Sequence, residues 1–159
     1  MAFNLQGKRS RGDFRMRAVL MSILRSSTTI LFIDHTEDRQ HWVLRLKTSL
    51  PDCVVLEAST GKEGLAICRS QQVECVISEL ALPDVSGFEV LLDLVPKPRH
   101  PEIAFIFLTR LTLSPMRQLA LNNGAQAYLI KSQCTGDELD GTIHTALARV
   151  TLSRKKRCP

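Results

Sequence analysis

Four short apolar runs in the sequence are each followed directly by a polar residue that is capable of chemistry. Asp34 follows TTILFI, Glu79 follows CVIS, Thr109 follows AFIFL, and Lys131 follows AYLI. If these runs are parallel strands of one sheet, their carboxyl ends meet at one edge, which is where chemistry collects in such sheets. We therefore expect one site that combines two carboxylates, a hydroxyl and an ammonium group.

Each of these residues also has a structural role that the sequence leaves open. Asp34 is suited to cap the helix that follows it, and Thr36 is an alternative cap. Lys131 near Glu79 is compatible with a plain ion pair, and Thr109 with a hydrogen bond at a helix start. The constellation is therefore more informative than any one of its members.

The elements that must position these side chains alternate between short apolar strands and amphipathic helices. The strands are predicted at 28–33, 53–56, 75–78, 104–108 and 127–130. The helices are predicted at 37–49, from residue 60 onward, and at 86–95, 114–122 and 136–150. This alternation is typical of a parallel sheet that helices cover on both faces. The predicted fold class is α/β, with a five-stranded parallel sheet flanked by five helices.

Local signals predict how some helices begin and end. Thr60 and Glu63 have the spacing of a capping box, in which each side chain accepts the backbone N–H of the other. Asn123-Gly124 is expected to end a helix with a residue in the left-handed conformation. The residues expected to face the core include Trp42, Leu65, Ala66 and Cys68.

The charge distribution separates the two ends of the chain from its middle. Residues 1–27 carry six Lys/Arg against one Asp, and residues 151–159 carry four Lys/Arg and no acid. The middle, 28–150, carries eleven basic and fifteen acidic residues. The 159 residues, of which 44% are hydrophobic, are enough for one domain with a full core. We therefore predict a basic N-terminal arm at 1–27, a domain at 28–150 and a basic C-terminal tail at 151–159.

The basic ends admit three interpretations. The first, which we favour, is that they are solvated, disordered tails. The second is an arm that binds nucleic acid or an anionic membrane without specificity, since Lys/Arg clusters attract phosphate groups. The third is a linker to an output region, for which the sequence leaves no room after Val150. The N-terminal stretch is also compatible with a true start at Met16 or Met21.

Several classes of protein are disfavoured by what the sequence lacks. No apolar run reaches the ~18–20 residues of a membrane-spanning helix, and the basic start has no secretory cleavage pattern. The five cysteines are scattered, without a C-x-x-C pair. We therefore expect buried free thiols in a reducing cytoplasm.

The segments around the four polar residues resemble a known family. ILFID (30–34), VISELALPDVSGFEVL (76–91), IFLT (106–109) and GAQAYLIKS (124–132) resemble, in order and spacing, the response-regulator receiver domains of two-component signalling. The resemblance covers about residues 28–150. It implies a flavodoxin-like fold.

The resemblance also implies a role for each site residue. Glu79 stands where the family has the aspartate that accepts a phosphoryl group from a histidine kinase. Thr109 and Lys131 match the residues that contact the phosphoryl oxygens. Tyr128 matches a switch aromatic residue.

For the metal, the resemblance implies that Asp34, the acceptor position Glu79 and the backbone carbonyl of Ala81 would hold Mg²⁺. His35 replaces a second acid of the family at this place. Because Mg²⁺ prefers oxygen ligands, its affinity is expected to be weakened.

Three further departures bear on the chemistry. Glu79 is one methylene longer than the usual aspartate, and such a displacement in a packed site costs orders of magnitude in rate. Arg110 is bulky where the family has a small residue. Ser132 stands where a proline usually follows the lysine.

We therefore expect a stand-alone receiver-like signalling module rather than an enzyme, with Glu79 as a partial mimic of a phosphorylated aspartate. The expected partners are a histidine kinase, a phosphotransfer protein or an effector. They would dock on the surface formed by 114–122, 127–130 and 136–150. The alternative is a working phosphoacceptor with weak Mg²⁺ binding. A flavodoxin-like cofactor binder is disfavoured, because the acidic DHTEDRQ (34–40) would repel phosphate.

Overall fold

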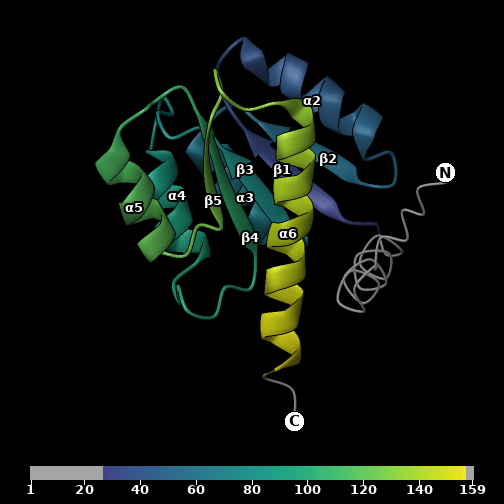
Figure 1. The fold of residues 1–159 in the computed structure, drawn as a ribbon, viewed down its shortest axis with the longest axis vertical. Coiled ribbons are helices and arrows are strands. Elements are labelled where there is room, and N and C mark those ends of the chain that lie inside the picture. The colour runs from purple at the N-terminus through teal and green to yellow at the C-terminus, as the bar shows by residue number, and fades with distance from the viewer. Residues whose placement is uncertain (1–26, 157–159) are drawn as a thin grey trace, which may run out of the picture.

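A five-stranded parallel sheet forms the centre of the molecule (Figure 1). The structure is a computed structural model that describes residues 27–156, and the residues before and after them are left out of the description. The strand order is β2-β1-β3-β4-β5, and every neighbouring pair is parallel. The strands are β1 (Thr29–Ile33), β2 (Val54–Ala58), β3 (Cys75–Ser78), β4 (Ala104–Thr109) and β5 (Ala127–Ile130). The predicted α/β class is thus confirmed, although β2 begins one residue later and ends two residues later than expected.

Helices cover both faces of this sheet. One face carries α2 (Asp38–Ser49) and α6 (Gly136–Lys155), and the other carries α3 (Gly61–Ser70), α4 (Gly87–Leu94) and α5 (Ser114–Asn122). Successive side chains of a strand point to opposite faces, so β1 sends Ile30 and Phe32 to the first layer and Leu31 and Ile33 to the second. A sheet buried on both faces explains why the strands are continuous apolar runs.

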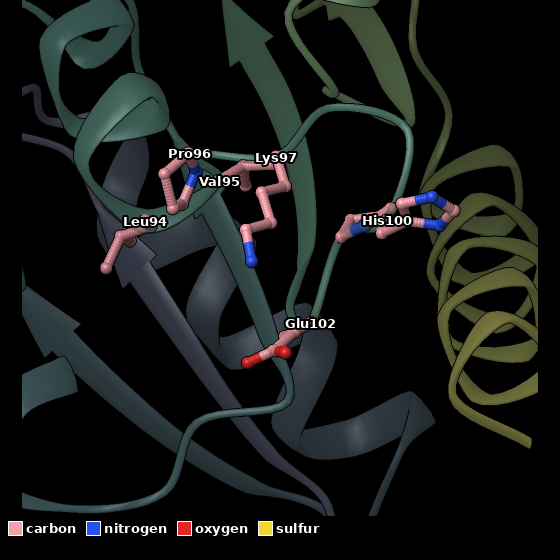
Figure 2. Close-up of a pocket in the computed structure, with 7 residues that line it drawn as sticks. Leu94, Val95, Pro96, Lys97, His100 and Glu102 are labelled. Atoms are coloured by element: carbon pink, nitrogen blue, oxygen red, sulfur yellow. The ribbon is translucent and has the colours of Figure 1, made fainter. Parts of the chain in front are cut away.

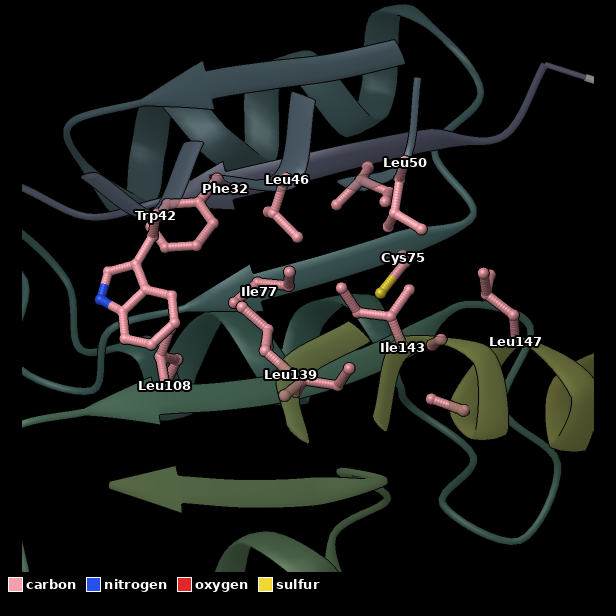
Figure 3. Close-up of a cluster of buried hydrophobic side chains, with 14 of the residues drawn as sticks. Phe32, Trp42, Leu46, Leu50, Cys75, Ile77, Leu108, Leu139, Ile143 and Leu147 are labelled. Carbon is pink, nitrogen blue, oxygen red and sulfur yellow. The ribbon is translucent and has the colours of Figure 1, made fainter. Parts of the chain in front are cut away.

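Trp42 belongs to the core between the sheet and the first helical layer, as predicted. It is buried with Phe32 of β1, Leu108 of β4 and Leu139 of α6 (Figure 3). This cluster attaches the start of α2 and the start of α6 to the same end of the sheet. Both helices are therefore held next to the carboxyl ends of the strands.

The helix caps differ in part from the predictions. Thr60 accepts the backbone N–H of Glu63 at 3.2 Å, but the Glu63 carboxylate accepts the N–H of Ser59 and not that of Thr60. A reciprocal capping box is present instead between Ser86 and Glu89 at the start of α4. On α3, Ala66 is exposed, contrary to the prediction, and Ile67 packs against the core together with Leu65 and Cys68.

The start of α2 and the end of α5 can be compared with the predicted helix caps. Neither Asp34 nor Thr36 caps α2, because the helix begins one residue later with Glu37 as N-cap and no side-chain cap bond. Asp34 instead accepts the backbone N–H of Thr36 at 2.7 Å. The left-handed residue after α5 is confirmed, since Gly124 has φ +99°.

The last helix is longer than predicted. It continues past Val150 to Lys155, so residues 151–155 of the predicted tail are helical. The arm at 1–27 lies outside the described residues except for its last residue, and so do residues 157–159. None of the helices within residues 27–156 is long and apolar enough to span a membrane.

The cysteines are less buried than expected. Cys75 is fully buried, whereas Cys53, Cys68 and Cys134 are half-buried, and all four are free thiols. Burial raises the pKa of the Cys68 thiol to about 11. These thiols are therefore protonated and poorly nucleophilic at neutral pH.

Candidate functional site

The register of the sheet brings the four polar residues to one edge. Ile33 pairs with Ser78, so Asp34 and Glu79 follow at the same level, and Thr109 pairs with Ile130, the residue before Lys131. The backbone ladder continues one residue beyond the strands: Glu79 N–H donates to Ile33 O at 2.9 Å, and Lys131 N–H donates to Thr109 O at 2.8 Å. The side chains are thus carried on rigid backbone, which makes the site precise.

The Glu79 carboxylate is the centre of the site and is buried, with 3% of the residue exposed. Its Oε1 accepts the Thr109 hydroxyl, and it also accepts the backbone N–H of Leu80 at 2.7 Å and that of Ala81 at 3.4 Å. Its Oε2 lies 3.2 Å from Lys131 Nζ and accepts the backbone N–H of Arg110 at 3.3 Å. Both oxygens are therefore occupied by donors from the protein itself.

Lys131 joins the two buried carboxylates. Its Nζ lies 2.5 Å from Asp34 Oδ2 and donates to Thr36 Oγ1 at 3.0 Å, in addition to its contact with Glu79. The side chains of Asp34, Glu79 and Lys131 are 1%, 3% and 5% exposed. Lys131 therefore donates hydrogen bonds to Asp34 and Thr36 and forms an ion pair with Glu79.

The loop from β3 to α4 holds Glu79 in place. Gly87 N–H donates to Leu80 O at 2.8 Å, and a Cβ built on Gly87 would lie 2.2 Å from Glu79 O. Only a glycine allows α4 to begin this close to the backbone of the site. The Asp84 carboxylate ties the same loop to α3 by accepting the N–H groups of Gly61 and Lys62 at 2.8 and 2.9 Å.

A second layer of charge lies outside the buried pair. Arg110 Nε donates to Asp38 Oδ2 at 2.9 Å, and Arg110 Nη2 lies 2.8 Å from the same oxygen. Desolvation acts to raise the pKa of Asp38, but the hydrogen bond from Arg110 and the charges of Lys131 and Arg110 outweigh it and lower that pKa. Lys131 Nζ is 3.5 Å from Asp38, so this outer pair lies directly over the inner one.

Asp38 belongs to this outer layer, although its position in the sequence predicts only an acid at the start of a helix. The only signal available was an acidic residue four positions after Asp34. His35, the residue expected to stand in for a metal-binding acid, is exposed and is one position away from the buried Asp34. Arg110 lies beside the site, as the sequence suggested, but it contacts Asp38 through its side chain and Glu79 only through its backbone.

Tyr128 is buried and points inward, with 4% of the residue exposed. Its hydroxyl donates to Leu111 O at 3.0 Å, and its ring packs against Phe107 with 5.7 Å between the ring centroids. Burial, followed by the charge of Glu79, raises the pKa of the Tyr128 hydroxyl. Thr109 also accepts the N–H of Leu111 at 3.1 Å, so Leu111 connects the tyrosine to the site.

The donor set does not fit Mg²⁺ well. Both side-chain carboxylates of the predicted metal site, Asp34 and Glu79, are already paired with Lys131, and Ala81 N–H is directed at Glu79. Among residues 27–156, no group of three or more His, Cys, Asp or Glu residues is arranged to hold a metal ion. Since Mg²⁺ needs several free oxygen ligands in an octahedral arrangement, we derive no step that uses it.

Comparison with known proteins agrees with the geometry. The model of the response regulator receiver domain family matches residues 16–144, twelve residues earlier at its start than our prediction of 28. The chain is 34% identical over 118 residues to the transcriptional regulatory protein UhpA of Escherichia coli K12, which covers 74% of this chain and 57% of UhpA. The chain therefore spans little more than half the length of this curated relative.

Solved structures show the same fold. A response regulator receiver domain protein from Clostridium thermocellum is 29% identical, with a TM-score of 0.65, over 79% of this chain and 98% of that one. The receiver domain of an HD domain-containing protein from Pseudomonas fluorescens Pf-5 is 25% identical, with a TM-score of 0.71, over 81% and 93% of the two chains. Together with the strand order, the buried acid after β3 and the lysine after β5, these matches show that the chain belongs to the response regulator receiver domain family.

Proposed function

We propose that this receiver domain acts in two-component signalling as a fixed-state module that is not phosphorylated in the usual way. In this proposal Glu79 stands permanently where a phosphorylated aspartate would stand in other receivers. In this proposal the domain is a cytoplasmic signalling module and not an enzyme. Its output is a protein–protein contact with a histidine kinase, a phosphotransfer protein or an effector.

The observation that carries this proposal is that one carboxylate engages both Thr109 and Lys131. A phosphoacceptor needs a free oxygen for in-line attack and a cation to neutralise the developing charge. Here the two Glu79 oxygens accept four hydrogen bonds, and the nearest cation, Lys131, is shared with Asp34. The donors of the protein itself therefore already occupy the Glu79 carboxylate, which supports a site that needs no phosphoryl group.

The state of Tyr128 supports the same reading. The hydrogen bonds from Tyr128 to Leu111 O and from Leu111 N–H to Thr109 link the Glu79 centre to β5. The proposed output surface consists of α5, β5 and α6 (Figure 1), and Tyr128 is a residue of β5. A carboxylate has less charge and fewer acceptor oxygens than a phosphoryl group, so the mimicry is partial.

The chemical test compares the wild type with Glu79→Asp and with Glu79→Asp combined with His35→Asp. Each protein is incubated with acetyl phosphate and Mg²⁺, and its intact mass is recorded. We expect no adduct on the wild type, a phosphoryl adduct on Glu79→Asp, and faster modification of the double variant, which restores a second acid. A phosphoryl adduct on the wild type would instead support the alternative of a working phosphoacceptor.

The mimicry has a separate test by NMR. Glu79→Gln keeps the shape of the side chain but removes its charge, and Glu63→Gln is a matched control on the exposed start of α3. We expect Glu79→Gln to shift the amide resonances of Leu111 and Tyr128, which lie beyond the direct neighbours of Glu79. Shifts confined to residues 79–81 would argue against a link to the output surface.

A further inference from the structure

The opposite edge of the sheet, where the strands begin, carries a concentration of exposed basic residues. The helix α6 passes this edge and continues beyond it (Figure 1). The sequence has no acidic residue after Asp140, and the last two turns of α6 and its cap expose four cations. These residues are Arg149, Arg154, Lys155 and Lys156.

The loop between α4 and β4 adds cations next to this helix. Arg154 donates a hydrogen bond to the backbone carbonyl of Glu102, which attaches the loop to α6. Lys97, Arg99 and His100 are exposed on the same loop. Figure 2 shows His100 between the loop and α6, with Lys97 and Glu102 bordering a hollow. If His100 is counted as neutral, the loop and the end of α6 together contain six Lys/Arg and one Glu, which gives a local charge of 6 − 1 = +5.

Most of these cations form no ion pair in the described part of the chain. None of the ion pairs found within residues 27–156 involves Lys97, Arg99, Arg149, Lys155 or Lys156. Among the acidic residues near this edge, Glu74 accepts the N–H of Thr29 at 2.8 Å and Asp93 of α4 pairs with Arg69 at 3.1 Å, whereas Asp52, in the turn before β2, is exposed.

We infer that this basic edge binds the phosphate backbone of nucleic acid without reading its sequence. A cluster of exposed cations neutralises phosphates and releases counterions, which is the main source of non-specific affinity. In the described part of the chain, α6 is the helix at this edge, and its apolar stripe packs on the sheet, so it is not free to enter a groove and read bases.

An acidic lipid surface fits this edge less well. Membrane-surface helices insert an apolar face among the lipids. In α6 that face is occupied by core residues such as Ile143, Leu147 and Val150. Leu152, which is 43% exposed, is the single large apolar side chain exposed on the described part of α6.

The test measures fluorescence anisotropy of labelled duplexes of about 20 base pairs in two unrelated sequences, using the full chain at low salt. Three charge-matched double variants are compared with the wild type. Lys155→Gln with Lys156→Gln removes two charges from α6, and Lys97→Gln with Arg99→Gln removes two from the loop. Lys62→Gln with Arg117→Gln is the control, since both residues are exposed in the first turns of helices on the opposite side. Gln keeps helix propensity.

We expect equal binding of the two duplexes and a loss of roughly 10²-fold in affinity between about 50 and 200 mM salt, as four phosphate contacts predict. Each edge variant should bind more weakly and lower the salt slope by about 2, one for each removed cation. The control variant should bind like the wild type. Glu102→Gln should bind more tightly, because it removes the acid from the basic loop.

Three results would overturn the inference. The first is no binding at the lowest salt, and the second is an equal loss in the control and edge variants. The third is binding to vesicles of phosphatidylserine and phosphatidylcholine with no binding to either duplex, which would identify a membrane partner. This test is independent of the proposed role of Glu79, since none of the variants touches that site.

Discussion

The two edges of the sheet use charge in opposite ways. At the carboxyl edge, Asp34, Glu79 and Lys131 are nearly inaccessible to solvent, and each has its partners within the domain. At the amino edge, Lys155 and Lys156 are exposed and take part in none of the ion pairs found in the described part of the chain.

The difference teaches which charges can act on a partner. A buried charge that is fully paired is costly to disturb and acts by positioning its neighbours. An exposed cation contributes little to stability and is available for an external anion. We therefore assign the fixed signalling state to the carboxyl edge and the electrostatic contact to the amino edge.

The largest expected effect is the difference in stability between two Lys→Met substitutions, one at each edge of the sheet. Lys131→Met leaves Asp34 and Glu79 buried without their cation, and we expect the free energy of unfolding to fall by about 3–5 kcal/mol. Lys155→Met should change it by less than about 0.5 kcal/mol. Urea unfolding at neutral pH measures both. Similar losses in the two variants would remove the distinction between the edges.

Two Gly→Ala substitutions compare a tightly packed position at the carboxyl edge with an open position on α6. Gly87→Ala places a methyl group against the backbone of Glu79 and Leu80, so we expect a loss of roughly 3 kcal/mol, the upper end for overpacking. A Cβ on Gly141, on the exposed side of α6, meets nothing within 4 Å, so Gly141→Ala should gain up to about 1 kcal/mol. Thermal unfolding of the two variants should therefore shift in opposite directions. A gain in both would mean that the loop after Glu79 adjusts freely.

A smaller effect is expected from a single hydroxyl. Thr109→Val removes one donor from the Glu79 carboxylate and the acceptor of Leu111 N–H, which should cost about 1–2 kcal/mol because other donors remain. Thr112→Val on the exposed loop is the control and should be nearly neutral. Chemical denaturation compares the two. If Thr109→Val were as neutral as its control, the Thr109 hydroxyl would not stabilise the site as we describe.

The smallest effect concerns acid pH and the loop that supports Glu79. Although desolvation acts to raise the pKa of Asp84, the backbone hydrogen bonds of Lys62, Val85 and Gly61 outweigh it and lower that pKa to about 2. A carboxyl group with a lowered folded-state pKa stabilises the fold above its unfolded pKa of about 4 and loses this contribution as the pH falls through about 2. Between these values the wild type should lose more thermal stability than Asp84→Asn. Parallel curves for the two proteins would contradict this role.

Much of this architecture is legible in the sequence. The apolar runs and their spacing predict five parallel strands, and the residue after each run predicts that Asp34, Glu79, Thr109 and Lys131 meet at one edge. Strands buried on both faces must be apolar along their whole length, so the points where polarity returns mark the strand ends. The roles of the four residues in signalling stay predictions.

Other features depended on contacts between distant segments. Asp38 joins the site because α2 starts next to Arg110 and Lys131, which lie 72 and more residues away in the chain. Ala66 is exposed and Ile67 packs against the core, because the way α3 packs on the sheet, and not the helical period alone, sets its buried face. Local patterns contain no information about such relative placement.

The sequence by itself determined the fold class, the strand ends and the set of polar residues at the carboxyl edge, because burial requires a fixed pattern of apolar positions. Only the tertiary structure decided that Lys131 is shared between Asp34 and Glu79 and that both Glu79 oxygens are occupied. It also decided that α6 runs on to Lys155 beside the basic loop. These outcomes depend on distances between side chains from different strands and helices, which are fixed only when the sheet and both helical layers pack together.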